Sequence, residues 1–209
     1  MQIAEPMTML TDYLLAGLCA VLGWRLWTRS ASGGHRSVGL LAGSLFSTAL
    51  GAVTGGTSHG LALVLGPAAL AVLWKVTVYS IGMTAFLFLA AVAWASLAGR
   101  WRQALLAAAV LQLAVYSLWM IDHDDFVYVI YDYVPAMLVV LGLKAWRLRQ
   151  GSGSAPWLIA GILVSFVGAG IQQSGLSLHR HFNANDLYHL VQMFAVWLLY
   201  RGGCEMRDL

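Results

Sequence analysis

The chain has 209 residues, of which 60% are hydrophobic and only 10% are charged. Soluble domains carry roughly a quarter charged residues, so this composition excludes an ordinary soluble protein and predicts an integral membrane protein. The net charge of +3 gives no indication of nucleic-acid binding. Two distant cysteines, Cys19 and Cys204, are too few for a disulfide framework or a cysteine metal site.

Seven apolar segments approach or exceed the roughly 20 residues that a membrane-spanning helix needs. In chain order they cover residues 9–28, 37–58, 67–98, 103–121, 125–146, 155–176 and 182–200. No Lys or Arg precedes the first segment, so we expect it to be retained rather than cleaved as a signal peptide. No stretch resembles a linker or a soluble domain. The sequence therefore predicts one all-α domain over residues 1–209, a bundle of seven transmembrane helices.

Basic residues predict how this bundle is oriented. Ten of the twelve lie at alternate junctions between segments: Arg25, Arg29, Arg36, Arg100, Arg102, Lys144, Arg147, Arg149, Arg201 and Arg207. The positive-inside rule assigns these junctions to the cytoplasm. We therefore expect the N-terminus outside and the C-terminus in the cytoplasm. Compactness and the lack of sorting signals favour a bacterial plasma membrane.

The other ionisable residues gather at the opposite, outer ends of the segments. The histidines there are His59, His123, His179, His181 and His189, and the acids are Glu5, Asp12, Asp122, Asp124, Asp125 and Asp186. Asp132 follows about two turns inside its helix. Random placement would not sort these groups to one side, so we expect a single polar site in the outer half of the bundle.

The start of the last segment holds the richest cluster. On a helix, His181, Asn185 and His189 share one face. His181 and His189 are then separated by about 12 Å, which is too far for both to bind one ion comfortably. A zinc site with three protein ligands would use His189, Asp186 or Asn185, and His59 from the second segment. His181 would join only if the helix began later. The alternative for His59 is a capping or interfacial histidine bonded to a backbone carbonyl.

Two charged residues lie at similar depth inside the membrane, Lys75 and Asp132. Intramembrane charges usually pair, so one interpretation is a structural ion pair between them. In the other interpretation, Asp132 is a metal ligand or general base and Lys75 steers an anionic head group. Asp122 is a second candidate base, and either Asp124 or Asp125 is expected to cap the fifth helix.

Smaller groups complete the expected site. Thr57 and Ser58 precede His59 and carry hydroxyls that could stabilise an oxyanion. Gly55 and Gly56 permit close helix approach. At the outer end of the sixth segment, Gln172 and Gln173 either line a cavity or bridge helices by hydrogen bonds, which is the commoner case.

Seven helices, His59 at the end of the second and a histidine-rich start to the seventh resemble the superfamily of alkaline ceramidases and progestin/adiponectin-receptor proteins. The resemblance implies a zinc-dependent membrane hydrolase, in which one helix-two histidine and a helix-seven HxxxH pair hold zinc for attack on a lipid amide. His59 and His189 match two of these ligands. Asn185 stands where the second helix-seven histidine is expected. Gly55 replaces the family's serine four residues before the helix-two histidine, and the third helix has no acid, only Lys75.

Two hypotheses follow from these residues. The first is a metal-dependent hydrolase of a membrane lipid, with zinc at His59, His189 and Asp186 or His181. Asp132 or Asp122 would be the base, and Ser58 or Lys75 would stabilise the oxyanion. The second is a non-enzymatic sensor or complex subunit whose His and Asp cluster is structural or pH-responsive, because histidines titrate near pH 6.5.

Overall fold

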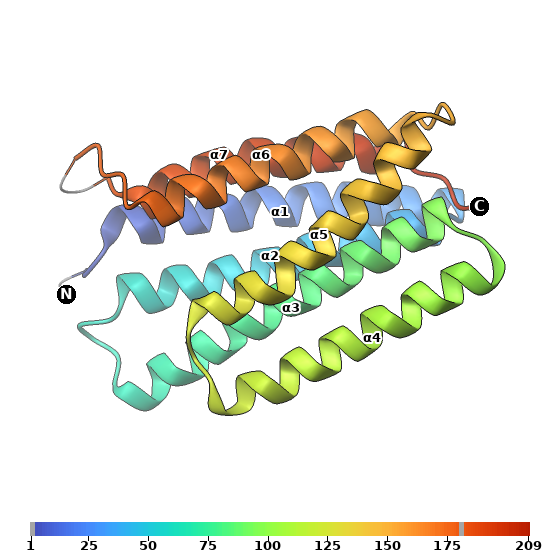
Figure 1. Cartoon of the computed structure of the whole chain (residues 1–209). Coiled ribbons are helices and arrows are strands. Elements are labelled where there is room, and N and C mark those ends of the chain that lie inside the picture. Colours follow the sequence, from blue (N-terminus) through green and yellow to red (C-terminus); the bar gives the residue numbers. More distant parts are fainter. Residues whose placement is uncertain (1–2, 180–181) are drawn as a thin grey trace.

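The computed structural model describes residues 3–179 and 182–209, and these form seven helices (Figure 1). The helices are α1 (Pro6–Gly33), α2 (Arg36–Gly60), α3 (Pro67–Ser96), α4 (Gly99–Asp122), α5 (Phe126–Leu148), α6 (Ser154–Ser174) and α7 (Ala184–Cys204). The described residues contain no β-strand, only one isolated bridge between His179 and Phe182. The predicted all-α, seven-helix fold is confirmed, with ends shifted by a few residues at most junctions.

Six of these helices, α1 to α6, are long and apolar enough to cross a membrane. Helix α7 does not meet the same measure, although its 21 residues equal the length of α6. The difference lies in its first half, which carries Asn185, Asp186, His189 and Gln192. The chain is therefore a helical membrane protein.

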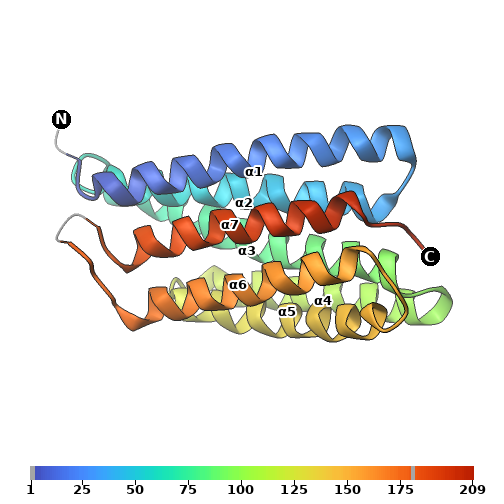
Figure 2. The ribbon, with the colours of Figure 1, turned by 90° about the horizontal axis from the view of Figure 1, so that it is seen from above.

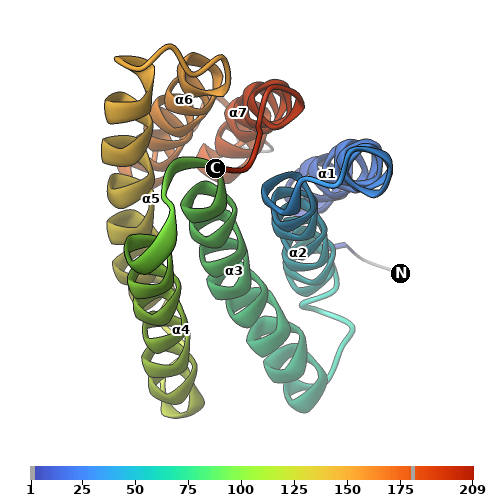
Figure 3. The same ribbon diagram turned by 90° about the vertical axis from the view of Figure 1, so that its right-hand side faces the viewer.

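The helices run side by side and alternate in direction, so that the two chain ends lie at opposite ends of the bundle (Figure 1). Helix α7 packs against both α6 and α1, and Figure 2 shows it between them. Helix α4 stands at the far edge from α1 (Figure 3) and packs mainly on α3, with little contact to α5. The membrane side that each end faces stays a prediction from the basic residues.

Glycines set the closest helix contacts. A Cβ added at Gly161 would lie 2.6 Å from Leu199 on α7, and one at Gly202 would lie 2.6 Å from Leu158 on α6. Such distances leave no room for a side chain at either glycine. The backbone of one helix therefore packs directly against a leucine side chain of the other. Small residues have this role in membrane helices because packing, rather than hydrophobicity, holds helices together in lipid.

The segment that follows α7 contacts the start of α2. Asp208 accepts hydrogen bonds from the backbone N–H groups of Arg36 (2.8 Å) and Ser37 (3.0 Å), so it caps the start of α2. Burial raises the pKa of Asp208, but hydrogen bonds from Ser37 and Arg36 and the nearby His35 outweigh it. The pKa of this carboxyl is therefore below its ordinary value.

A carboxyl whose pKa is lowered by folding stabilises the fold above its unfolded pKa, near 3.9, and loses that contribution as the pH falls through the folded value. We expect Asp208→Ala to cost about 1 kcal/mol at pH 7, the usual cost of losing a helix cap. The difference from the wild type should shrink as the pH is lowered below about 4. Unfolding titrations at pH 7 and pH 3 measure this, and an equal difference at both would contradict the role of the charge.

Candidate functional site

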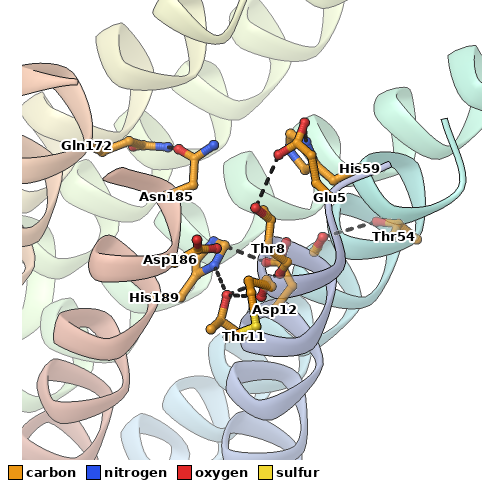
Figure 4. Close-up of polar contacts among 12 residues, drawn as sticks. Glu5, Thr8, Thr11, Asp12, Thr54, His59, Gln172, Asn185, Asp186 and His189 are labelled. Atoms are coloured by element: carbon orange, nitrogen blue, oxygen red, sulfur yellow. Dashed lines mark hydrogen bonds and ion pairs between the residues drawn. The ribbon is translucent and has the colours of Figure 1, made fainter. Parts of the chain in front are cut away.

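The site is built around His189, on the second turn of α7. Its Nε2 lies 3.2 Å from Oδ1 of Asp12 on α1, and its Nδ1 lies 2.9 Å from Oγ1 of Thr11 (Figure 4). All three side chains are buried. Both imidazole nitrogens therefore have a protein partner, one acidic and one neutral.

The Thr11 hydroxyl decides which protonation state this arrangement can hold. Thr11 Oγ1 is also within hydrogen-bonding distance of the carbonyls of Met7 (3.0 Å) and Thr8 (3.1 Å), but its single hydrogen can serve one acceptor at a time. When it donates to Nδ1, the imidazole is neutral. When it donates to a carbonyl, Nδ1 can carry a proton and donate to Thr11. The pair of Asp12 and His189 can thus gain a proton with one hydroxyl rotation.

Thr11, His189 and Asp12 have the partner order of a nucleophile–base–acid triad. The hydroxyl of Thr11, however, is buried and is not among the groups that line the neighbouring cavity. Asp12 and His189 do line it. Thr11 therefore orients the imidazole, and the Asp12–His189 pair is the part that a bound molecule would meet.

Local sequence fixes the start of α7 next to this pair. Asn183 Oδ1 accepts from the N–H groups of Asn185 (2.8 Å) and Asp186 (3.4 Å), and Asp186 Oδ2 accepts from the N–H of Asn183 (2.7 Å). This is a reciprocal capping box. The other oxygen of Asp186, Oδ1, is buried and has no hydrogen-bond partner among the described residues.

A glycine brings α1 and α2 together at the same level. A Cβ added at Gly56 would lie 2.6 Å from the Cβ of Asp12 and 3.3 Å from the carbonyl of Met9. The predicted close approach at this glycine is confirmed. It places Asp12 between α2 and α7, where the side chain is buried.

A second acid–histidine pair lies nearer the end of the bundle. Nδ1 of His59 is 3.5 Å from Oε1 of Glu5, whose Oε2 accepts from the hydroxyl of Thr8 (3.1 Å) (Figure 4). The ring of His59 meets Trp74 edge-on, with centroids 6.4 Å apart. His59 is thus not simply bonded to a backbone carbonyl.

Both histidines line one cavity of about 380 Å³. Its polar wall residues are Asp12, Thr48, His59, Trp74, Thr77, Gln172, Gln173, Asn185, Tyr188 and His189. The Nε2 amide of Gln172 donates to Oδ1 of Asn185 (3.2 Å), so this glutamine both lines the cavity and bridges two helices. No Lys or Arg among the described residues lines it.

A smaller apolar cavity of about 120 Å³ adjoins this one. The two share the wall residues Leu15, Thr48, Ile81, Phe126, Gln172 and Tyr188. The smaller cavity is otherwise walled mainly by apolar and aromatic side chains, among them Val129, Ile130 and Phe166. Together the two offer a compartment that carries most of the polar side chains beside a more apolar one.

Lys75 and Asp132 are not partners, so the predicted ion pair is wrong. Lys75 Nζ pairs with Asp124 and donates to the carbonyls of Met120, Ile121 (3.0 Å) and His123 (3.1 Å), which closes the last turn of α4. Asp132 faces α4 instead and lines a different groove. Position along each helix predicts the level of these residues but not the direction in which each side chain points.

The remaining candidates lie apart from the cavity. Asp122 is exposed at the end of α4, and Ser58 is half-buried and does not line the cavity. His181 lies outside the described residues. Asp125 caps α5 by accepting from the N–H of Val127 (3.2 Å), which confirms one of the two capping predictions.

The sequence does not reveal the partners that α1 contributes. It predicts Asp12 only as one of several outer acids, and it does not single out Thr11. The available signal is a carboxylate with two threonines, Thr8 and Thr11, at helical spacing inside an apolar segment. An acid that far inside a membrane helix needs a partner, and α7 offers a histidine at the same level.

Among the described residues, no three His, Cys, Asp or Glu side chains are close enough to hold one metal ion. To bind an ion, His189 would have to give up its contact with either Asp12 or Thr11. Zinc therefore stays a prediction.

Neither the curated proteins nor the solved structures gave a match. A family model described as a family of unknown function, DUF6962, matches residues 7–208, which is nearly the whole chain. The chain therefore belongs to the DUF6962 family.

Proposed function

We propose that the protein is a membrane sensor that binds an amphiphilic lipid, and that a proton on the Asp12–His189 pair controls the binding. The observation that carries the proposal is the position of this buried pair in the wall of a cavity that also carries several polar side chains and adjoins a more apolar one. A volume of about 380 Å³ falls within the usual range of ligand pockets. The apolar cavity supplies room for the start of a hydrocarbon chain.

The wall chemistry favours an uncharged head group. Gln172, Gln173 and Asn185 each offer both a donor and an acceptor, which suits hydroxyl and amide groups. Phosphate would need Lys or Arg nearby, and none lines the described wall. The acids Asp12 and Glu5 would also repel it. A lipid with an amide- and hydroxyl-bearing head is therefore the best match.

The protonation state of the Asp12–His189 pair sets the charge that a bound head group would contact. The titratable groups around the polar cavity are Glu5, Asp12, Asp186, His59 and His189, with Tyr133 and Tyr188 beside the apolar part. Burying several carboxylates with two imidazoles is costly unless protons balance their charges. A head group that forms hydrogen bonds with only one protonation state of the pair would stabilise that state. Its affinity would then depend on pH.

The proposal predicts saturable binding of N-dodecanoyl ethanolamine to the protein in nanodiscs. We expect His189→Gln and Gln172→Ala each to weaken binding at least tenfold, about 1.4 kcal/mol. Dodecyl phosphate should compete poorly. The affinity of the wild type should change between pH 5 and 8, and that of His189→Gln should change less. The measurement is equilibrium binding of the labelled amide with empty nanodiscs subtracted.

Leu163→Ala is the matched control, because Leu163 is exposed on α6 and lines neither cavity. Its affinity should equal that of the wild type. Wild-type affinity in His189→Gln, or equal binding of the phosphate, would refute the sensor.

A zinc-dependent hydrolase of the same kind of lipid is the second candidate. It is favoured by the buried Oδ1 of Asp186, which has no hydrogen-bond partner among the described residues and lies beside His189 (Figure 4). Zinc would supply Lewis-acid activation of water, and Asp12, whose carboxyl lies beside His189, would accept a proton from that water. The purified protein would then carry about one zinc per chain, lost in His59→Ala and His189→Ala, and would release dodecanoate from the amide. A folded, metal-free wild type that leaves the amide intact excludes the hydrolase.

A further inference from the structure

A second groove lies between α4 and α5, on the outside of the bundle and away from the site above. Its volume is about 640 Å³, and its walls include Tyr116, Trp119, Tyr128, Tyr131 and Asp132. Helix α4 stands at the edge of the bundle and touches α5 little (Figure 3). Trp119 and Tyr131 are 50% and 67% exposed. The groove therefore opens sideways, toward the surrounding lipid.

Asp132 places a carboxyl group in this groove. The residue is only 8% exposed. Gln112 on α4 donates from Nε2 to Oδ1 of Asp132 (3.0 Å) and to its backbone carbonyl (2.8 Å). No Lys, Arg or His of the described part of the chain pairs with it. Acids inside a membrane normally have a cationic partner, so a charge of the opposite sign is missing here.

Aromatic rings line the groove, and one face of Trp119 is covered by the stacked ring of His123, with centroids 4.1 Å apart. Trp119 meets Tyr128 edge-on with centroids 5.6 Å apart, and Tyr128 meets Tyr131 at 6.4 Å. The faces of such rings attract cations, and clusters of them recognise quaternary ammonium groups. The wall on α4 continues with the aliphatic side chains of Leu111 and Val115.

We infer that this groove binds a single-chain amphiphile with an ammonium head. The ammonium group lies between the Asp132 carboxylate and the rings of Trp119 and Tyr128, and the hydrocarbon chain follows Leu111 and Val115. Asp132 is six residues inside α5, about 9 Å from its start, whereas a layer of lipid head groups is about 5–8 Å thick. A zwitterionic phospholipid would also bring a phosphate next to this carboxylate. Both points favour a cation that dissolves in the membrane over a bilayer lipid.

The test uses the full chain in phosphatidylcholine nanodiscs and radiolabelled decyltrimethylammonium below its micelle concentration. We expect saturable binding at one site above the empty-nanodisc background. The isosteric neutral analogue 2,2-dimethyldodecane should not compete. Asp132→Asn, which keeps the hydrogen bond to Gln112, should weaken binding at least tenfold. Asp122→Asn is the matched control, because Asp122 is exposed at the end of α4 and does not line the groove.

Trp119→Leu provides a second readout at an exposed position, should Asp132→Asn fail to fold. Loss of a cation–π contact should weaken binding about 2- to 30-fold. His189→Gln should leave the cation affinity unchanged, which separates this groove from the proposed lipid site. Effective competition by the neutral analogue, or wild-type affinity in Asp132→Asn or Trp119→Leu, would overturn the inference.

Discussion

Replacing His189 with Leu is expected to lower the free energy of unfolding by about 3–5 kcal/mol, because Asp12 is then left buried without its partner. The pair lies between α1, α2 and α7 next to Gly56, and both side chains are buried even though they line the cavity. Removing one partner of a buried charged pair destabilises the protein by more than the intact pair stabilises it. The reason is that the remaining group stays buried without its partner. Reversible unfolding in mixed micelles, followed by circular dichroism, measures the change.

The double variant Asp12→Asn with His189→Leu separates this explanation from simple loss of packing. Removing both charges should cost at least about 1 kcal/mol less than the sum of the two single changes. Leu190→Ala is the control on the same helix, because Leu190 is 44% exposed, and it should change stability by about 0.5 kcal/mol at most. Strict additivity of Asp12→Asn and His189→Leu would contradict a direct interaction.

Gly56→Ala is expected to cost about 1–3 kcal/mol, the range found when a methyl group is forced into a filled space. The new Cβ would lie 2.6 Å from the Cβ of Asp12 and 3.3 Å from the Met9 carbonyl. Because backbone atoms are involved, α1 must move away from α2. The Asp12–His189 contact should lengthen, and N-dodecanoyl ethanolamine should bind more weakly. The same unfolding and binding assays report both effects.

Gly17→Ala is the matched control for this change. Gly17 lies on α1, the helix that Gly56 packs against, and it is exposed. A Cβ added at Gly17 would have no atom of a neighbouring residue within 4 Å. Alanine there should stabilise the helix by about 0.5–1 kcal/mol, since glycine is unfavourable in a helix interior. Equal effects at Gly17 and Gly56 would show that helix propensity, rather than close packing, governs Gly56.

The seven helices could be predicted from the sequence because a membrane leaves the backbone little choice. Every N–H and C=O in the hydrocarbon region must be bonded within the segment, so a long apolar run becomes a helix. The same reasoning places His59 and His189 at one end of the bundle. Depth follows directly from position along a helix, at 1.5 Å per residue. Asp125, at a helix start, was predictable as a cap for the same local reason.

Partner choice was decided by the tertiary structure. Lys75 and Asp132 have similar depth, yet Lys75 turns to Asp124 and the end of α4, and Asp132 turns to Gln112. Asp186 was a candidate ligand by spacing, and its Oδ2 instead caps α7. Sequence periodicity defines the faces of a helix, but it does not say which neighbour each face meets.

His189 shows both sides of this division. Its residue type and its level in the bundle follow from the sequence, and so does the expectation that a buried imidazole needs a partner. That the partners are Asp12 and Thr11 follows only from the packing of α7 against α1. Contacts between distant segments depend on the rotation of each helix about its own axis. That rotation is fixed by packing over the whole bundle, including the close approach at Gly56, and not by any local pattern.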